Sequence, residues 1–329
     1  MIQVDFIYKQ NMKNILILGA GGQIGTELVP HLQNLYGEDH VIAAEIKPEL
    51  CTKLRLFSIT EEFDALDVQK YAEVIKKYRI DSIFNLVALL STTGEKNPQL
   101  AWKINIGALI NSLEIAREKG CSLFTPSSIA VFGNNTPHQN TPQDTIMHPG
   151  TVYGVCKVTG ELLSDYYFSK FGVDTRSVRF PGIISNGALP GGGTTDYAVE
   201  IFYQAIKNKH FTCPLPAGSY LDMLYMPDAL NACSQLMEAD PAKLIHRNSF
   251  NVTAMSFCPN DLMADIQEYI PDFTMEFQIN PVMEAIAASW PDSMDDSCAR
   301  LEWGWNPVWN RKMMVQDMLQ VLRARLASE

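Results

Sequence analysis

NILILGAGGQIG, from Asn14 to Gly25, is the most informative segment of this sequence. Its apolar residues 15 to 18 are typical of a parallel strand that is buried on both faces. Three equally spaced glycines follow, at Gly19, Gly22 and Gly25, and then an apolar run with helical spacing at 28 to 32. Because unpaired N–H groups at a helix N-terminus attract anions, this strand, turn and helix predict a pyrophosphate site. A tight turn, however, needs glycine with or without a ligand.

An acidic residue at the end of the next predicted strand indicates which dinucleotide would bind. The strand covers 41 to 46 and places Glu45 twenty residues beyond Gly25. A carboxylate there can accept hydrogen bonds from both hydroxyls of an adenosine ribose, and it would repel a 2′-phosphate. Further along, the Asp64 carboxylate is positioned to accept from the adenine amino group, while Asp67 is expected to cap a helix. The sequence therefore predicts NAD rather than NADP.

The first half of the chain repeats one unit, a strand followed by a helix. Further buried strands are expected at 82–88 and 122–125, and long helices at 98–119 and 151–171. This alternation predicts an α/β fold with a doubly wound parallel Rossmann sheet, in which ligands bind at the carboxyl ends of the strands.

The chain is expected to divide into two main regions. Residues 12–180 would form an NAD-binding Rossmann domain, with parts of the later chain interleaved. Residues 181–329 would form mainly a smaller α/β substrate-binding lobe and a closing helix. Residues 1–11 contain neither an arginine nor a long apolar core, so we interpret them as a leader or an alternative-start extension.

Composition argues against several kinds of partner. The formal net charge is −11, with no block of lysine and arginine, so neither nucleic acid nor an anionic membrane surface is expected to bind. No apolar run approaches the length of a membrane span. The seven cysteines are scattered without a CxxC pair, and the six histidines lack the spacing of a metal site. We therefore expect free thiols, a reducing, cytoplasmic environment and no bound metal.

The pair Tyr153 and Lys157 is the strongest catalytic signal. Residues four apart on a helix stand on the same face. A free tyrosine titrates near pH 10, but a neighbouring ammonium favours the phenolate, which can then act as a base. Ser127 and Ser128 end a strand 25 residues upstream, where a hydroxyl can hold the reacting oxygen. Each feature is common by itself, but together with the glycine turn and Glu45 they indicate a catalytic site.

Several motifs together resemble the extended short-chain dehydrogenase/reductase superfamily, which includes nucleotide-sugar epimerases and dehydratases. They are the three-residue glycine spacing, KINIGALINSLEIA around Asn105, PSSIAVFG and the Tyr-x-x-x-Lys pair. The glycine spacing differs from the usual dinucleotide fingerprint, which has glycine at the position of Ile24. Three longer segments resemble the short-chain type of L-threonine 3-dehydrogenase: 144–163, 176–198 and 289–305. The similarity extends from about Asn14 to the last helix.

This resemblance implies roles for individual residues. Tyr153 would be the base and Lys157 its electrostatic partner, which also holds the nicotinamide ribose. The active-site serine of the threonine dehydrogenases falls on Ser127, whereas that of the epimerases aligns with Ser128, so both stay open. The positions implied to contact the amino acid are Ser91, Ser127, Ser128, Tyr153, Thr194, Thr195 and Trp290, although the two threonines could equally be helix N-caps. Those expected to contact NAD are Gly19, Gly22, Gln23, Ile24, Gly25, Glu45, Asp64, Ala65, Ala88, Asn105, Tyr153, Lys157 and Pro181.

By the same resemblance, the chain would oxidise the side-chain hydroxyl of L-threonine to 2-amino-3-oxobutyrate with NAD and without a metal. One alternative is a nucleotide-sugar epimerase or dehydratase, but such enzymes usually hold a diphosphate with arginines, and residues 190–240 contain none. The other is an NAD-sensing protein without catalytic activity, since a fold does not determine function. A homodimer paired through helices 98–119 and 151–171 is expected. Residues 191–193 could be the hinge of a loop that closes over the substrate.

Overall fold

A six-stranded parallel sheet forms the centre of the molecule. The computed structural model describes residues 12–187, 191 and 193–327, so the predicted leader at 1–11 lies outside the described residues. The strand order is β3-β2-β1-β4-β5-β7, and all neighbouring strands are parallel. The strands are β1 (Ile15–Leu18), β2 (Val41–Glu45), β3 (Ile59–Glu62), β4 (Ser82–Asn85), β5 (Ser122–Phe124) and β7 (Thr175–Arg176). Because the order changes direction at β1, the predicted doubly wound fold is confirmed.

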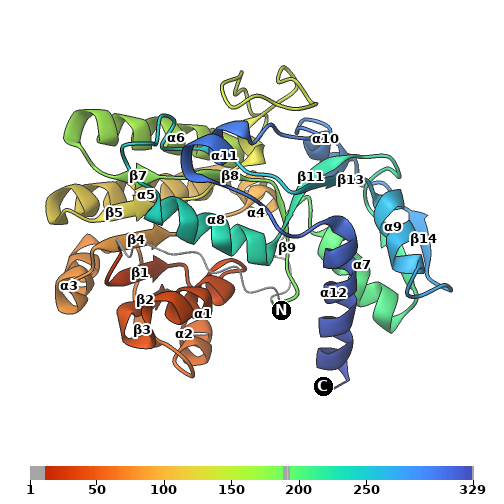
Figure 1. Cartoon of the computed structure of the whole chain (residues 1–329), viewed down its shortest axis with the longest axis horizontal. Helices are drawn as coiled ribbons and strands as arrows, with labels where there is room; N and C mark the ends of the chain where they lie inside the picture. The colour runs from red at the N-terminus through yellow and green to blue at the C-terminus, as the bar shows by residue number, and fades with distance from the viewer. Residues whose placement is uncertain (1–11, 188–190, 192, 328–329) are drawn as a thin grey trace.

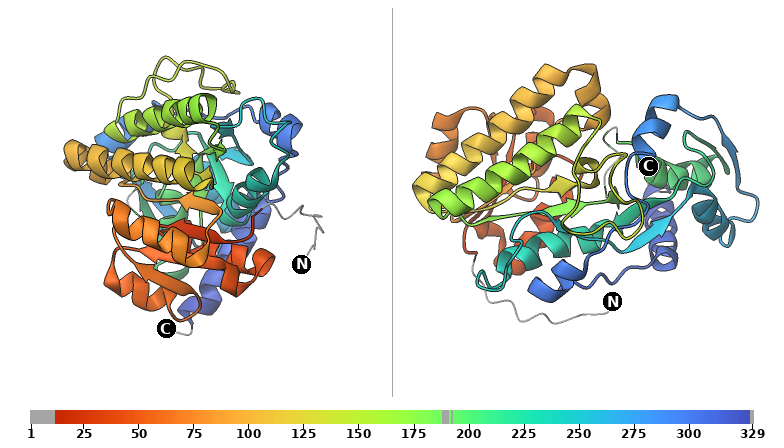
Figure 2. Two further views of the ribbon diagram at one scale, coloured as in Figure 1. Left: turned by 90° about the vertical axis from the view of Figure 1, so that its left-hand side faces the viewer. Right: turned by 90° about the horizontal axis from the view of Figure 1, so that it is seen from above.

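Helices cover both faces of this sheet (Figure 1, Figure 2). They are α1 (Gly25–Tyr36), α2 (Pro48–Leu54), α3 (Val68–Tyr78), α5 (Pro98–Lys119), α6 (Val152–Phe171) and α8 (Met226–Glu238). Helices α5 and α6 lie side by side over one face, together with α3, while α1 and α8 pack on the opposite face. The helix expected at 98–119 has the same bounds as α5.

Strand β1 is buried on both faces, as its apolar run predicts. Ile15 and Ile17 pack in one hydrophobic cluster with residues of α1 and α8. Leu16 and Leu18 pack in another cluster with residues of α3 and α5. Since successive strand residues point to opposite faces, all four side chains lie in the core.

The turn after β1 requires glycine for steric reasons. Gly19 has a φ of +72°, in the left-handed region that favours glycine. A Cβ atom on Gly25 would lie only 2.6 Å from the carbonyl oxygen of Gly19. These glycines therefore let the chain bring α1 directly against the end of β1, at the edge where a ligand would bind.

Short strands extend the sheet toward the predicted catalytic residues. β6 (Ser127–Ser128) follows β5 and pairs with β8 (Val178–Phe180), which follows β7. β12 (Phe250–Asn251) pairs with the other side of β8. Strand β12 and helix α8 thus come from the later chain but pack with the first half. A domain boundary near residue 180 stays a prediction.

The remaining chain forms a smaller lobe beside the large sheet (Figure 1). It contains the three-stranded sheet β13-β11-β9 and the parallel pair β10-β14. Its strands are β9 (Gly182–Ile184), β10 (His210–Cys213), β11 (Leu221–Tyr225), β13 (Met255–Phe257) and β14 (Thr274–Phe277). The helices of the later chain are α7 (Tyr197–Lys207), α9 (Pro259–Gln267), α10 (Pro281–Ala287), α11 (Ser297–Trp303) and α12 (Arg311–Leu326).

The first half of the chain also contains two short 3-10 helices, η1 (Glu38–His40) and η2 (Ile129–Val131).

The segment after β4 differs from expectation. The strand expected at 82–88 ends at Asn85, and the residues that follow include a short helix, α4 (Ser91–Lys96). The sequence of α4 is STTGEK, in which serine, threonine and glycine have low helix propensity. Apolar periodicity therefore gives no sign of this helix.

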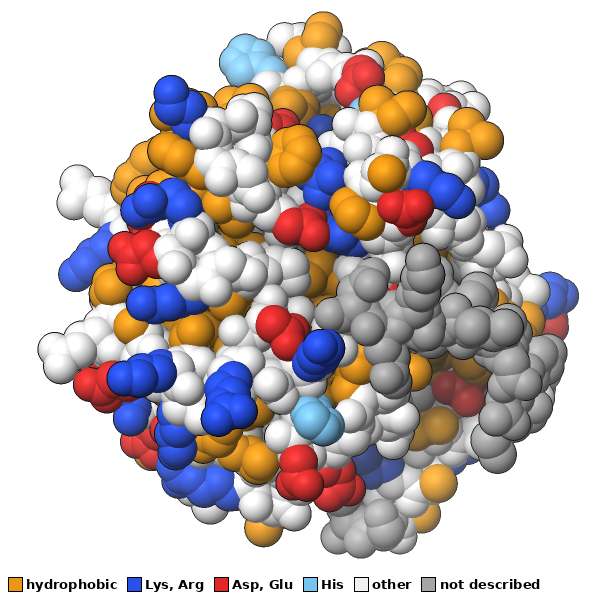
Figure 3. Space-filling view, turned by 60° about the vertical axis from the view of Figure 1, so that its left-hand side comes forward, with side chains coloured by type: hydrophobic (Ala, Val, Ile, Leu, Met, Phe, Trp, Pro, Cys, Tyr) orange, Lys and Arg blue, Asp and Glu red, His pale blue; other side chains and the backbone are white. Residues whose placement is uncertain are grey.

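The surface carries both signs of charge. On the face drawn in Figure 3, basic and acidic side chains are interspersed, unlike a continuous basic surface for nucleic acid. In the described part of the chain, no helix combines the length and the apolar character needed to cross a membrane.

Asp222, on β11, is a fully buried carboxyl group that should make stability depend on pH. Burial raises its pKa to about 7, although the hydroxyl of Thr253 and the N–H of Met294 favour the charged form. In an unfolded chain the pKa of aspartate is about 3.9. At a pH between these two pKa values, Asp222 keeps its proton in the folded chain and releases it in the unfolded chain. The stability contributed by this group is therefore full in acid and is lost as the pH rises through about 7.

Asp222→Asn should accordingly become more stable relative to the unmodified chain as the pH rises from about 5 to about 8. The difference in unfolding free energy between the two chains should change by at most about 1.4 kcal/mol per pH unit, because one proton is involved. Urea unfolding of both chains at the two pH values measures it, with Asp39→Asn at an exposed carboxylate as the control. A difference in unfolding free energy that does not vary with pH would contradict this role of Asp222.

Candidate active site

Helix α6 presents Tyr153 and Lys157 together beside the end of β6. The helix is capped by Thr151, whose hydroxyl accepts a backbone N–H of the first turn. Nζ of Lys157 lies 5.4 Å from the centroid of the Tyr153 ring and donates to the carbonyl oxygen of Pro126 at 2.6 Å. The ammonium is thus anchored between the phenol and the residue that precedes the two serines.

The two serines of β6 have different surroundings. Ser127 is buried, and its hydroxyl donates to Oε1 of Glu161 at 2.5 Å. Ser128 is partly exposed, and its Oγ accepts the N–H of Ala130 at 3.2 Å, which leaves its proton available for another acceptor. The two hydroxyls therefore differ in their availability to a substrate, because that of Ser127 already donates to Glu161.

Glu161 belongs to a buried ion pair beneath β6. Its carboxylate accepts from Nε and Nη2 of Arg179, on β8, at 2.9 Å each. Arg179 also donates to the carbonyl oxygen of Gln143 at 2.8 Å and to Oδ1 of Asn251 at 3.1 Å. This network joins α6, β8 and β12 and holds β6 in place. Sequence reasoning missed Glu161, although its place four residues after Lys157 puts it on the same helix face.

A cavity of about 150 Å³ lies beside Tyr153, between β6, α4 and the segments that follow β8. Its lining includes every residue expected to contact the amino acid: Ser91, Ser127, Ser128, Tyr153, Thr194, Thr195 and Trp290. Lys157 and four further residues expected at the cofactor line it as well: Gln23, Ile24, Ala88 and Pro181.

Three features near the start of α7 were not predicted. The N-cap of α7 is Asp196, so neither Thr194 nor Thr195 caps this helix. Within the described residues, Oγ1 of Thr194 is buried without a hydrogen-bond partner. Asp196 also lines the cavity, and its Oδ2 accepts the N–H of Gly193 at 2.6 Å. In the sequence, Asp196 could have been assigned to the site only from its position directly after the two threonines.

A second cleft, of about 540 Å³, follows the glycine turn. Of the residues expected at the cofactor, it is lined by Gly19, Gly22, Glu45, Asp64, Ala65 and Ala88. It shares Leu86 and Ala88 with the cavity, so the two hollows adjoin one another. Gly25 and Asn105 line neither hollow, and the Asn105 side chain instead bonds the backbone N–H and carbonyl of Leu89 at 2.7 and 3.1 Å.

The surroundings of Glu45 fit the adenosine end of a dinucleotide. Its Oε2 accepts the N–H of Gly21 at 3.0 Å, and its Oε1 accepts those of Ile46 and Lys47 at 2.9 and 3.2 Å. The carboxylate is therefore fixed at the end of β2, directly beside the glycine turn. A turn free of side chains at a helix N-terminus, a carboxylate on the adjacent strand and a cleft leading toward Tyr153 are what such a cofactor requires.

Known proteins share both the sequence and this architecture. A model described as the NAD dependent epimerase/dehydratase family matches residues 15–252. A protein of Staphylococcus aureus strain MRSA252, named an uncharacterized epimerase/dehydratase, is 50% identical over 315 residues, which cover 95% of this chain and 98% of that protein.

Among solved structures, several that are similar to this chain are of one enzyme type. An L-threonine dehydrogenase from Clostridium difficile is 51% identical, with a TM-score of 0.93 and coverage of 95% of this chain and 98% of that chain. A monomeric L-threonine 3-dehydrogenase of metagenomic origin is 40% identical, with a TM-score of 0.89 and coverage of 94% and 99%.

Proposed function

This chain belongs to the NAD-dependent epimerase/dehydratase family, and from that premise we propose that it oxidises the side-chain hydroxyl of L-threonine to 2-amino-3-oxobutyrate, with NAD as the hydride acceptor. The observation that carries the proposal is the small, hydroxyl-rich cavity beside Tyr153 and Lys157. The similarity to solved threonine dehydrogenases supports the same substrate.

The cavity suits an amino acid better than a nucleotide sugar. Its volume is about 150 Å³, and it adjoins the cleft proposed for the cofactor. The described part of its lining has several hydroxyl groups and the carboxylate of Asp196, but no arginine. A diphosphate is typically held by arginine, so an epimerase or dehydratase substrate would lack its usual partner here. The ammonium group of an amino acid, in contrast, is compatible with Asp196.

Residues of this chain would supply the base and the orientation. Tyr153 would act as the base that removes the proton of the threonine hydroxyl, and the Lys157 ammonium lies 5.4 Å from the centroid of its ring. We assign the hydroxyl that holds the reacting oxygen to Ser128, because that of Ser127 is bonded to Glu161. Bound NAD would supply the acceptor for the hydride of the β-carbon. The cavity wall, which includes Trp290, orients the substrate and excludes water.

The proposed cofactor site follows the cleft. Glu45 and Asp64 would hold the adenosine, and the turn at Gly19 and Gly22 would hold the pyrophosphate at the N-terminus of α1. Lys157 would hold the nicotinamide ribose at the cavity. No step of the proposed reaction requires a metal ion.

Threonine-dependent formation of NADH tests the proposed function. Purified protein is assayed with NAD and L-threonine in the presence of a chelator, beside L-serine, NADP and a panel of UDP-sugars. Formation of NADH with threonine is the expected result. Conversion of a UDP-sugar without threonine oxidation would indicate an epimerase or dehydratase. Tight NAD binding without turnover of any substrate would indicate the NAD-sensing alternative.

Glu45 is expected to select NAD against NADP. Glu45→Gln should weaken NAD binding about tenfold and reduce the preference over NADP, because it removes charge-assisted hydrogen bonds to the ribose and the repulsion of a 2′-phosphate. Titrations with both cofactors measure the two Kd values. Glu62→Gln is the matched control, since Glu62 stands opposite Glu45 on β3 and is exposed. An unchanged preference in Glu45→Gln would remove Glu45 from the cofactor site.

The homodimer remains a proposal, supported by exposed apolar residues on α5 and α6. They include Trp102 and Ile110 on α5 and Val155, Leu162 and Tyr166 on α6, with exposed fractions between 39% and 60%. Exposed apolar surface of this kind marks interaction sites, and pairing of the two helices with those of a second copy would cover it.

Light scattering after size-exclusion chromatography should therefore give twice the chain mass of 36.8 kDa. Leu162→Glu should give the mass of one chain, because it places a charge in the proposed interface. Leu56→Glu, at a leucine that follows α2 and is still more exposed than Leu162, should leave the dimer intact. A single-chain mass for the unmodified protein would reject the dimer and make it resemble the monomeric relative.

A further inference from the structure

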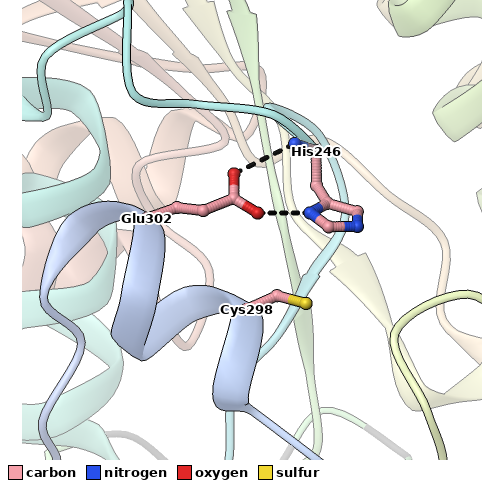
Figure 4. A group of neighbouring side chains, drawn as sticks. All are labelled: His246, Cys298 and Glu302. Atoms are coloured by element: carbon pink, nitrogen blue, oxygen red, sulfur yellow. Dashed lines mark hydrogen bonds and ion pairs between the residues drawn. The ribbon is translucent and has the colours of Figure 1, made fainter.

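Three side chains that can ligate a metal meet beside α11 (Figure 4). His246 comes from the segment before β12, and Cys298 and Glu302 lie one turn apart on α11. An imidazole nitrogen, the thiol sulfur and a carboxylate oxygen all lie within 4.8 Å of one another. None of the three lines the cavity or the cofactor cleft.

The backbone and neighbouring side chains hold this cluster in place. Oε2 of Glu302 accepts the N–H groups of Ile245 and His246 at 2.6 and 3.0 Å, and Oε1 is bonded to Nδ1 of His246. The imidazole ring also packs against Phe250 at a centroid distance of 6.0 Å. Glu302 is buried, while His246 and Cys298 are partly exposed, so an ion can enter from one side.

Asp144 adds a fourth group on the solvent side. Its Oδ2 lies 3.4 Å from Nε2 of His246. The side chain is 87% exposed, so it can turn toward an ion without leaving a packed position. Asp144 belongs to the segment between η2 and α6, a third part of the chain.

We propose that His246, Cys298 and Glu302 bind one Zn²⁺ ion, with Asp144 as the fourth ligand. Zinc takes thiolate, imidazole and carboxylate ligands at about 2.0–2.3 Å, so neighbouring ligand atoms of a tetrahedral site lie about 3.3–3.8 Å apart. The separations within 4.8 Å among His246, Cys298 and Glu302 therefore require only small movements of these side chains. Asp144 contacts Nε2 of the imidazole, at the opposite edge of the ring from the Nδ1 that is bonded to Glu302, so its exposed side chain has to rotate toward the ion. The sulfur ligand favours zinc over magnesium or calcium, which prefer oxygen ligands.

The proposed ion would join three separate segments of the chain. It would tie α11 to the segment before β12 and, through Asp144, to the segment that leads into α6. A site closed by four protein ligands is structural, because no position is left for a substrate. Zinc should therefore stabilise the folded chain without taking part in the proposed oxidation of threonine.

Zinc binding to the full chain tests this proposal. After treatment with a chelator and its removal, titration of Zn²⁺ against a chromogenic competitor should give one ion per chain. Cys298→Ser and His246→Gln should each weaken the affinity at least about tenfold, since each removes one ligand. His210→Gln is the matched control: His210 also faces a carboxylate, that of Glu276 at 3.5 Å, but is not part of the cluster.

Two readouts from the unmodified chain do not depend on how the variants fold. Co²⁺ in place of Zn²⁺ should produce a thiolate-to-metal absorption band, and Zn²⁺ should slow the alkylation of Cys298, whereas the other six cysteines are buried throughout. Zinc should also raise the unfolding temperature of this chain and not that of Cys298→Ser. Failure to bind zinc, binding unchanged in both variants, or alkylation unaffected by zinc would each overturn the proposal. Threonine oxidation in chelator tests the catalytic proposal separately.

Discussion

Tyr153→Phe is expected to lower kcat for threonine-dependent NADH formation by about three orders of magnitude, because it removes the proposed base. Affinity for NAD should not change. The phenylalanine ring keeps the shape of the tyrosine ring and its place near Lys157, whose Nζ lies 5.4 Å from the ring centroid. The loss should therefore be confined to the proton-transfer step.

Steady-state kinetics and an NAD titration on the same preparation separate these two effects. Tyr269→Phe, which removes the hydroxyl of an exposed tyrosine in the smaller lobe, is the control and should match the unmodified chain in both measurements. Turnover that survives Tyr153→Phe would show that another group acts as the base. Loss of NAD binding together with turnover would show that the phenol is needed to hold the cofactor instead.

Ser128→Ala is expected to lower kcat about 100-fold, because it removes the donor that would hold the reacting oxygen. Ser127→Ala should have little effect on kcat. Instead it should lower the free energy of unfolding by about 1–2 kcal/mol, since the buried Glu161 carboxylate loses one of its donors. Arg179 still donates two hydrogen bonds to that carboxylate, which limits the loss.

These two variants are controls for each other, because they remove the same hydroxyl at adjacent positions. Kinetics with threonine and denaturant unfolding should be measured for both. A large loss of kcat in Ser127→Ala, with Ser128→Ala nearly unchanged, would reverse the assignment. It would also imply that the Ser127 hydroxyl leaves Glu161 when the substrate binds.

The sequence by itself was sufficient to predict those structural features that depend on residues close together in the chain. The apolar run of β1, the glycines that follow it and the bounds of α5 were all predicted from local spacing. The same holds for Tyr153 and Lys157, because a separation of four residues places both on one face of any helix. Strand and helix periodicity, together with the steric freedom of glycine, act over a few residues and can be read directly.

The tertiary structure alone distinguished residues that look alike in the sequence. Ser127 and Ser128 are chemically identical, and they differ because Glu161, which pairs with Arg179, lies next to only the first of them. His246 and Cys298 are 52 residues apart, and no local pattern places them side by side. Contacts of this kind depend on how distant helices and strands pack, and packing brings together segments whose sequences carry no sign of one another.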